Sequence, residues 1–222
     1  MLYEVVHAVL PPVVKAVWRP EVIGLDNIPM TGPVIVASNH LSFADSMVIP
    51  FVVPRKVAFL AKEDYFTGPG VKGALIRGWF EGIGMVPVDR DDTRAAIASL
   101  DIALAVLAQG EAFGIYPEGT RSRDGRLYRG RTGIGHLALT SGAPVVPVGL
   151  TGTEDLQPVG STVPRIAKVT VRFGSPLRFE GAYDGMPPAR ARRAITDQVM
   201  SAIQGLSGQE VAGVYNERPA EP

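Results

Sequence analysis

The stretch Val34-Ile35-Val36-Ala37-Ser38-Asn39-His40-Leu41-Ser42-Phe43-Ala44-Asp45 carries both a structural and a chemical signal. Its first four residues are continuously apolar, which is typical of a strand that is covered on both faces. The strand leads into a histidine, and an aspartate follows five residues later. A neutral imidazole accepts a proton near pH 7, and a carboxylate on its second nitrogen fixes the tautomer, so this pattern indicates a general base.

The spacing of His40 and Asp45 leaves two interpretations open. Residues five apart on a regular helix lie roughly 140° apart around its axis, so the two groups can meet only if His40 precedes the helix. Ser42 is a good N-cap with Asp45 at its N3 position, and this predicts a helix that begins there. The alternative is a plain capping box, in which Asp45 accepts the Ser42 amide and His40 lies exposed in a loop.

The composition excludes several kinds of protein. A chain of 222 residues predicts one domain with a sizeable core. Basic and acidic residues balance at 22 each, so the overall charge predicts no nucleic-acid partner. The chain has no cysteine, which excludes disulfides, a thiolate nucleophile and cysteine-ligated metals. Its three histidines are scattered with no His-x₃-His pair, so we expect no catalytic zinc site. We also expect no other metal and no cofactor.

The first residues of the chain are apolar but interrupted. Charged residues and Pro11-Pro12 leave no window of the roughly 18 apolar residues that a spanning helix needs. A basic leader region and a small-residue cleavage site are also missing. We therefore predict an amphipathic, membrane-associating helical segment over residues 1–19, which would hold the protein at the cytoplasmic face of the cell membrane as a peripheral or monotopic protein. The alternative is a helix that packs on the domain's own core.

Apolar β-type runs alternate with helical patterns along the rest of the chain. This alternation predicts an α/β domain over residues 20–206, with a mixed, mostly parallel sheet flanked by helices, and a flexible tail over 207–222. The predicted strands are Val34–Ser38, Val57–Ala61, Met85–Val88, Ala112–Tyr116, Val145–Leu150 and Lys168–Phe173. The clearest predicted helices cover about residues 93–109, 132–142 and 188–206.

A second segment whose side chains could take part in binding or catalysis is Ile115-Tyr116-Pro117-Glu118-Gly119-Thr120-Arg121-Ser122. It leaves a predicted strand at its carboxyl end, where open α/β sheets place their ligands. Five arginines lie between residues 121 and 131, and guanidinium groups suit the bidentate binding of a phosphate. The alternative is a solvated loop that turns at Asp124-Gly125.

Two more segments complete a pattern of four. Gly84 to Arg90 predicts a strand that delivers an arginine, and Ala143 to Leu150 predicts an apolar strand. In this order the four segments resemble the glycerolipid acyltransferase family, the lysophospholipid (1-acylglycerol-3-phosphate) acyltransferases. The matching blocks are Asn39-His40-x₄-Asp45, Gly84 through Arg90, Pro117 through Ser122 with Tyr116 in place of phenylalanine, and Val146-Pro147-Val148.

This resemblance implies a membrane-associated O-acyltransferase of phospholipid biosynthesis. The enzyme would move a fatty acyl group from acyl-CoA or acyl-carrier protein to the free hydroxyl of lysophosphatidic acid, giving phosphatidic acid. His40 would take the proton from the acceptor hydroxyl, and Asp45 would hold His40 and stabilise its charged form. The implied partners are the lysophospholipid and acyl-thioester substrates, the membrane surface and the carrier protein.

The resemblance also assigns substrate-binding residues. Arg90, Glu118, Gly119, Thr120 and Arg121 match the positions that bind the glycerol phosphate, with Glu118 expected to orient an arginine or a glycerol hydroxyl. Three alternatives stay open. The acceptor could be another lysophospholipid or glycerol 3-phosphate, the protein could be a thioesterase or lipid hydrolase in which His40 activates water, or it could bind anionic lipid without catalysis.

Overall fold

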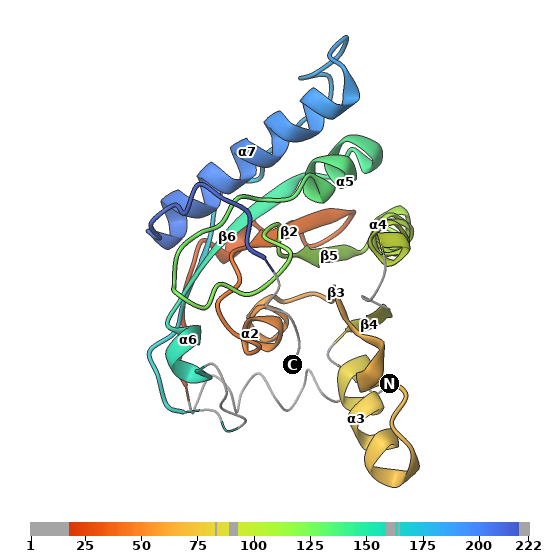
Figure 1. The fold of residues 1–222 in the computed structure, drawn as a ribbon, viewed down its shortest axis with the longest axis vertical. Helices are drawn as coiled ribbons and strands as arrows, with labels where there is room; N and C mark the ends of the chain where they lie inside the picture. The colour runs from red at the N-terminus through yellow and green to blue at the C-terminus, as the bar shows by residue number, and fades with distance from the viewer. Residues whose placement is uncertain (1–17, 83, 89–92, 159–162, 164, 218–222) are drawn as a thin grey trace.

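The computed structural model describes residues 18–82, 84–88, 93–158, 163 and 165–217 (Figure 1). Its strands are β1 (Glu21–Ile23), β2 (Val34–Ser38), β3 (Val57–Lys62), β4 (Met85–Val88), β5 (Ala112–Ile115), β6 (Val145–Thr151) and β7 (Thr170–Phe173). Its α-helices are α2 (Asp45–Val52), α3 (Gly70–Gly82), α4 (Thr93–Ala108), α5 (Gly133–Ser141), α6 (Thr153–Leu156) and α7 (Pro188–Ser207). Two 3₁₀ turns, η1 (Leu25–Asn27) and η2 (Glu63–Tyr65), complete the described elements.

One seven-stranded sheet joins these strands in the order β1-β7-β6-β2-β5-β3-β4. The strands from β6 to β4 run parallel to one another, whereas β7 runs antiparallel to β6 and β1 runs parallel to β7. The predicted mixed, mostly parallel sheet is therefore confirmed. The central strand β2 lies between β5 and β6, so the chain segments that leave β2 and β5 emerge side by side at the carboxyl edge of the sheet.

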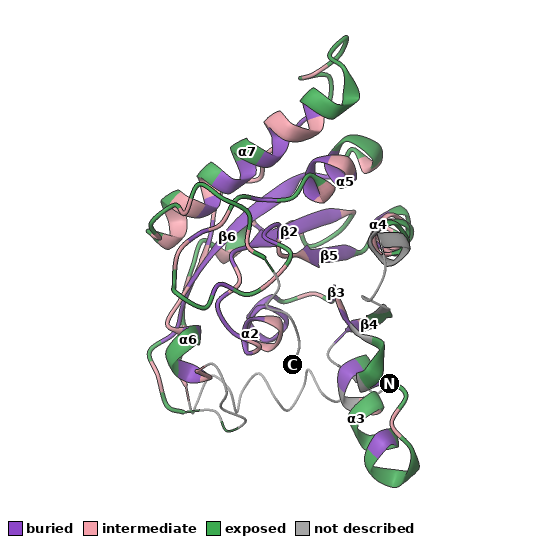
Figure 2. Cartoon of the chain, in the orientation of Figure 1, coloured by how far each residue is buried: buried purple, intermediate pink, exposed green. Residues whose placement is uncertain are grey.

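Helices cover both faces of the sheet, which explains why β2 is apolar at successive positions. Val34 and Val36 belong to one buried cluster, together with residues of α2. Ile35 and Ala37 point to the other face, where they belong to a second cluster with residues of α4, α5 and α7. Figure 1 shows α4, α5 and α7 on one face and α2 on the other, and Figure 2 shows the buried strands between them.

The three predicted helices are confirmed to within a residue or two. In α7 the buried residues Ala191, Ile195, Val199 and Ile203 recur every four residues and form a single apolar stripe. The helix has a proline at its start, where the missing N–H costs nothing, and ends at Gly208 in the left-handed conformation. The helix α5 ends in the same way at Gly142.

The short elements α6, η1 and η2 were not predicted, nor were β1 and α3, whose sequences carry no clear signal. The edge strand β1 has only three residues, too few for a recognisable alternation. In α3, glycines at positions 70, 73, 78 and 82 read as chain breakers. Gly73 has a packing reason, since a Cβ atom there would overlap the main chain of Gly68. The helix therefore uses glycine for close approach.

The C-terminal residues that follow α7 form main-chain hydrogen bonds with the rest of the domain. Residues 209–216, called the strap below, run beside residues 121–131, called the arginine loop below (Figure 1). The Leu127 amide donates to the Glu210 carbonyl (2.8 Å), the Ala212 amide to the Leu127 carbonyl (2.9 Å) and the Arg129 amide to the Val214 carbonyl (2.9 Å). The strap pairs with a loop, so its sequence has no helix or strand period to detect.

The predicted membrane-associating segment lies almost wholly outside the described residues. Of that segment, Trp18 is described, and its indole Nε1–H donates to the Arg165 carbonyl at 2.9 Å. Within the described part of the chain, none of the helices has the length and apolar character required to cross a membrane.

Candidate active site

His40 and Asp45 meet in the turn that connects β2 to α2. The strand ends at Ser38 and the helix begins at Asp45, so His40 precedes the helix as the geometric argument required. The His40 Nδ1 atom lies 2.8 Å from Asp45 Oδ2. The side chain of Asp45 is fully buried, whereas that of His40 remains 15% exposed. The pair therefore combines a buried anchor with an imidazole that reaches the surface.

A single carboxylate oxygen organises this turn. Asp45 Oδ2 accepts hydrogen bonds from His40 Nδ1, from the Leu41 amide (2.7 Å) and from the Ser42 amide (2.9 Å). The capping bond and the imidazole contact, which the sequence left as alternatives, thus coexist on one atom. Because an ionised carboxylate only accepts, the arrangement assigns the proton to Nδ1 and leaves the Nε2 lone pair for chemistry.

Ser42 does not cap the helix as predicted. The N-cap position is Ala44, and the Ser42 hydroxyl instead donates to the Gln157 carbonyl (2.9 Å) while it accepts the Ala44 amide (3.3 Å). The start of α2 therefore depends on Asp45, whose carboxylate both holds the turn and orients His40.

The main chain of His40 is bonded on both sides to the segment that follows β5. Its amide donates to Glu118 Oε1 (3.0 Å), and its carbonyl accepts the Ser122 amide (2.8 Å). Parallel pairing of β2 with β5 explains this meeting, because both segments emerge at the same edge. The first and third sequence blocks thus form a single unit.

Glu118 binds main chain rather than an arginine. Its second oxygen, Oε2, accepts the Tyr128 amide at 2.9 Å, so the buried carboxylate connects His40 to the arginine loop. Burial raises the pKa of Glu118 to about 7, although the amides of Tyr128 and His40 oppose the shift, and the nearby charges of Asp45 and Asp124 add to it. Among the described contacts of Glu118 there is no arginine, and its expected role toward a substrate hydroxyl stays a prediction.

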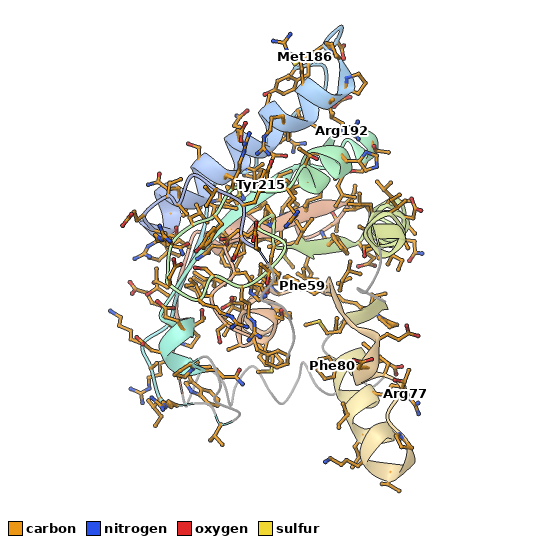
Figure 3. All side chains as sticks on the ribbon, viewed as in Figure 1. Phe59, Arg77, Phe80, Met186, Arg192 and Tyr215 are labelled. Carbon is orange, nitrogen blue, oxygen red and sulfur yellow. The ribbon has the colours of Figure 1, made fainter. Side chains whose placement is uncertain are left out.

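Tyr116 lies directly against the imidazole. The two rings stack with centroids 3.9 Å apart and planes 9° apart, and the Tyr116 hydroxyl lies 2.9 Å from Ser46 Oγ on α2. The Phe59 ring of β3 (Figure 3) also lies near Tyr116, with ring centroids 5.4 Å apart. The sequence marked Tyr116 only as a departure from phenylalanine, and nothing in the pattern announced its contact with His40.

Four of the five predicted substrate-binding residues are described in the structure, and these four lie together in the turn after β5. Gly119, Thr120 and Arg121 follow Glu118 in the turn after β5, and Arg121 is exposed. Gly119 has a φ of 80°, a conformation that favours glycine, and a Cβ atom there would lie 2.9 Å from Nε of the flexible Arg131 side chain. The predicted contribution of Arg90 lies outside the described residues.

The arginines of the arginine loop differ in whether another side chain contacts them. Arg126 forms an ion pair with Asp124 at 2.7 Å. The guanidinium carbons of Arg129 and Arg131 lie 5.1 and 5.7 Å from the centre of the Tyr215 ring, a cation–π arrangement. Arg121 and Arg123 are exposed, and no side-chain partner is described for either of them.

Fold and site together define an α/β domain with an imidazole–carboxylate pair at the carboxyl edge of its central strand, beside a cationic loop. The family model named Acyltransferase matches residues 19–151, which is more than half of the chain. The chain therefore belongs to the Acyltransferase family.

Individual relatives agree with this assignment. The chain is 33% identical over 146 residues to the chloroplastic 1-acyl-sn-glycerol-3-phosphate acyltransferase BAT2 of Brassica napus, covering 65% of this chain and 40% of that protein. It is 29% identical over 182 residues to 1-acyl-sn-glycerol-3-phosphate acyltransferase alpha of Mus musculus, covering 82% and 58%. The chain thus spans about half, or less, of the length of these relatives.

A solved structure shares the fold. The crystal structure of the 1-acyl-sn-glycerophosphate (LPA) acyltransferase PlsC from Thermotoga maritima superposes with a TM-score of 0.60 at 25% identity. The similarity covers 90% of this chain and 82% of that one.

Proposed function

We propose that this chain is an O-acyltransferase that moves a fatty acyl group from an acyl thioester to the free hydroxyl of lysophosphatidic acid, giving phosphatidic acid. The observation that carries the proposal is the His40–Asp45 pair, bonded through the main chain of His40 to the block that leads into the arginine loop. The relatives named as 1-acyl-sn-glycerol-3-phosphate acyltransferases support the choice of acceptor. The thioester is that of coenzyme A or of acyl-carrier protein.

His40 acts as the general base in this reaction. Its Nε2 lone pair takes the proton of the acceptor hydroxyl as that oxygen attacks the thioester carbonyl carbon. The imidazolium that forms is stabilised by Asp45, which already accepts the Nδ1 hydrogen. Collapse of the tetrahedral intermediate breaks the carbon–sulfur bond, and the departing thiolate takes the proton back from Nε2. The enzyme returns to its starting state without an acyl-enzyme.

Arg121 binds the acceptor phosphate. Arg126, Arg129 and Arg131 already have acidic or aromatic partners, whereas Arg121 and Arg123 are exposed without a described side-chain partner. Of these two, Arg121 is the one that directly adjoins the catalytic block. The adjacent Ser122 amide is bonded to the His40 carbonyl, so the main chain of Arg121 is held close to the base. A phosphate anchored there places the acceptor alcohol near His40, and placing of this kind supplies much of the rate.

The reaction takes place at the cytoplasmic face of the membrane, with the protein bound peripherally. Helix α3 is mostly exposed (Figure 2), and it presents the apolar side chains of Val71 and Leu75 with relative exposures of 78% and 70%. The basic residues Lys72 and Arg77 on the same helix are also exposed. Apolar and cationic side chains together are typical of a surface that rests on anionic lipid.

A panel of acceptors tests the proposal. The purified protein is incubated with vesicles, one labelled acyl thioester and either lysophosphatidic acid, lysophosphatidylcholine, glycerol 3-phosphate or monoacylglycerol, and the products are identified by mass spectrometry. We expect labelled phosphatidic acid as the main product. Free fatty acid as the main product would identify a hydrolase instead.

Two single arginine substitutions test the phosphate contact. Arg121→Ala should raise KM for lysophosphatidic acid by about tenfold or more, because a charge-assisted contact is lost. The turnover of monoacylglycerol, which has no phosphate, should stay within about twofold of the wild type. Arg123→Ala removes another exposed charge two residues away and serves as the matched control. Equal effects of the two substitutions would contradict a specific contact at Arg121.

A further inference from the structure

The strap reaches the catalytic block as well as the arginine loop. Gln209 lies at its beginning, directly after the C-cap of α7. The Gln209 Oε1 atom accepts a hydrogen bond from Asn39 Nδ2 at 2.8 Å, and its Nε2 atom donates to the Gly125 carbonyl at 2.7 Å. One side-chain amide thus connects the residue before His40 to the turn of the arginine loop.

The contact with Asn39 completes a buried set of hydrogen bonds. Asn39 Nδ2 also donates to the Leu150 carbonyl (2.9 Å), and Asn39 Oδ1 accepts the Leu150 amide (2.8 Å), so the residue is fixed to the end of β6. The second hydrogen on Nδ2 goes to Gln209. Asn39 is therefore held in the core by hydrogen bonds to β6, and Gln209 joins it to the exposed turn of the arginine loop.

The far end of the strap holds the same loop a second time. Asn216 Nδ2 donates to the Arg121 carbonyl at 3.0 Å, and Arg131 Nη2 donates to the Asn216 carbonyl at 3.3 Å. The Tyr215 ring lies under the guanidinium groups of Arg129 and Arg131, while its hydroxyl accepts from Arg193 Nη1 of α7 at 3.3 Å. Figure 3 labels Tyr215 where the strap passes in front of the sheet.

We propose that Gln209 is a positioning residue for the acceptor site, and that the strap holds the arginine loop at the distance from His40 that a bound lysophosphatidic acid requires. This inference rests on the proposed function, in which Arg121 binds the acceptor phosphate. Gln209 fixes the Gly125 end of the loop to Asn39, and Asn216 fixes the Arg121 end. When the loop shifts, a phosphate bound to Arg121 carries the acceptor hydroxyl away from the base.

The test measures KM for lysophosphatidic acid and KM for the acyl thioester separately. Gln209→Ala should raise KM for lysophosphatidic acid by about tenfold, since one half-buried and one exposed hydrogen bond that hold the loop are lost together. KM for the acyl thioester and the turnover of monoacylglycerol should stay within about twofold of the wild type. Gln209→Glu keeps the acceptor for Asn39 but removes the donor to Gly125, so it should resemble Gln209→Ala.

Two further variants control for general damage. Glu210→Ala changes the exposed neighbouring side chain and keeps the main-chain carbonyl that binds Leu127, so it should behave as the wild type. Asn216→Ala removes the anchor at Arg121 from the other end of the strap and should raise the same KM even if Gln209→Ala folds poorly. Thermal unfolding of each variant, followed by circular dichroism, verifies the fold.

The outcomes distinguish this inference from the proposed function. If the wild type makes no phosphatidic acid, the proposed function fails and the inference fails with it. If the wild type is active but Gln209→Ala and Asn216→Ala leave KM for lysophosphatidic acid within twofold, the inference alone fails. Equal rises of KM for both substrates, or wild-type behaviour of Gln209→Glu, would also overturn it, because they would indicate a structural role only.

Discussion

The imidazole of His40 lies flat on the phenol ring of Tyr116, with ring centroids 3.9 Å apart and ring planes 9° apart. Asp45 holds the same imidazole at its edge through Nδ1, so the ring is restrained both in its plane and on one face. The Tyr116 hydroxyl contacts Ser46, which directly follows Asp45 on α2. Base, carboxylate and stacking ring therefore form a single packed group.

Tyr116→Ala should lower kcat by about 3- to 10-fold, because a stacked aromatic pair is worth about 0.5–1.5 kcal/mol. KM for either substrate should change by less than about twofold, since Tyr116 acts on the base rather than on a substrate. Tyr116→Phe keeps the stacked ring and should retain most of the turnover. Steady-state kinetics on vesicles measures both variants.

The hydroxyl contact can be tested from both ends. Ser46→Ala removes the same hydrogen bond as Tyr116→Phe, so the two single variants should have similar, small effects, and the double variant should lose no more than either. Fully additive losses in this cycle would mean that the two hydroxyls act independently.

Asp45→Asn should reduce kcat by about 10²–10⁴-fold, because the amide cannot stabilise the imidazolium that forms on His40. It should also lower the free energy of unfolding by about 1–3 kcal/mol, because an amide NH₂ would replace Oδ1, which is buried and has no described partner. Kinetics and urea unfolding measure the two effects. Asp155→Asn, on the exposed face of α6, is the matched control and should leave both quantities unchanged.

Stability should depend on pH through Glu118, whose pKa is raised to about 7 by burial. A raised carboxyl pKa means that the folded state binds more protons than the unfolded state between about pH 4.5 and 7. The contribution of Glu118 to the free energy of unfolding is therefore largest at low pH, and it falls by about 3 kcal/mol as the pH rises through this range.

Glu118→Gln isolates this contribution, because it cannot ionise. The wild type should be more stable relative to Glu118→Gln at pH 5 than at pH 8, as measured by urea unfolding at both values. A stability difference that stays constant with pH, or grows toward pH 8, would show that Glu118 is ionised throughout this range.

Much of the fold could be predicted from the sequence, because strands covered on both faces are apolar throughout. The boundaries of β2 and β4 are those predicted, and the long helices α4 and α7 carry periodic apolar faces with clear ends. The strand β1 and the helix α3 could not be found, since the first is too short to alternate and the second contains four glycines.

The candidate site could likewise be predicted only in part from the sequence. The geometric argument left the pairing of His40 with Asp45 open beside a plain capping box, and the family resemblance implied the pairing. In the structure the two side chains meet at 2.8 Å. The contacts of Tyr116 and Gln209 arise from side chains that meet across 76 and 170 positions of sequence, respectively, and no local pattern encodes such distances. The main-chain partners of Glu118 were missed because a buried carboxylate and a ligand-binding carboxylate look alike in sequence.

The most direct test of the proposed catalysis is the rate of phosphatidic acid formation by His40→Ala in vesicles that contain lysophosphatidic acid and a labelled acyl thioester. The thermal unfolding curve is compared in parallel to establish that the variant is folded. We predict a loss of at least about 100-fold in kcat with the fold retained. Near-normal turnover by a folded His40→Ala variant would contradict the role of His40 as general base.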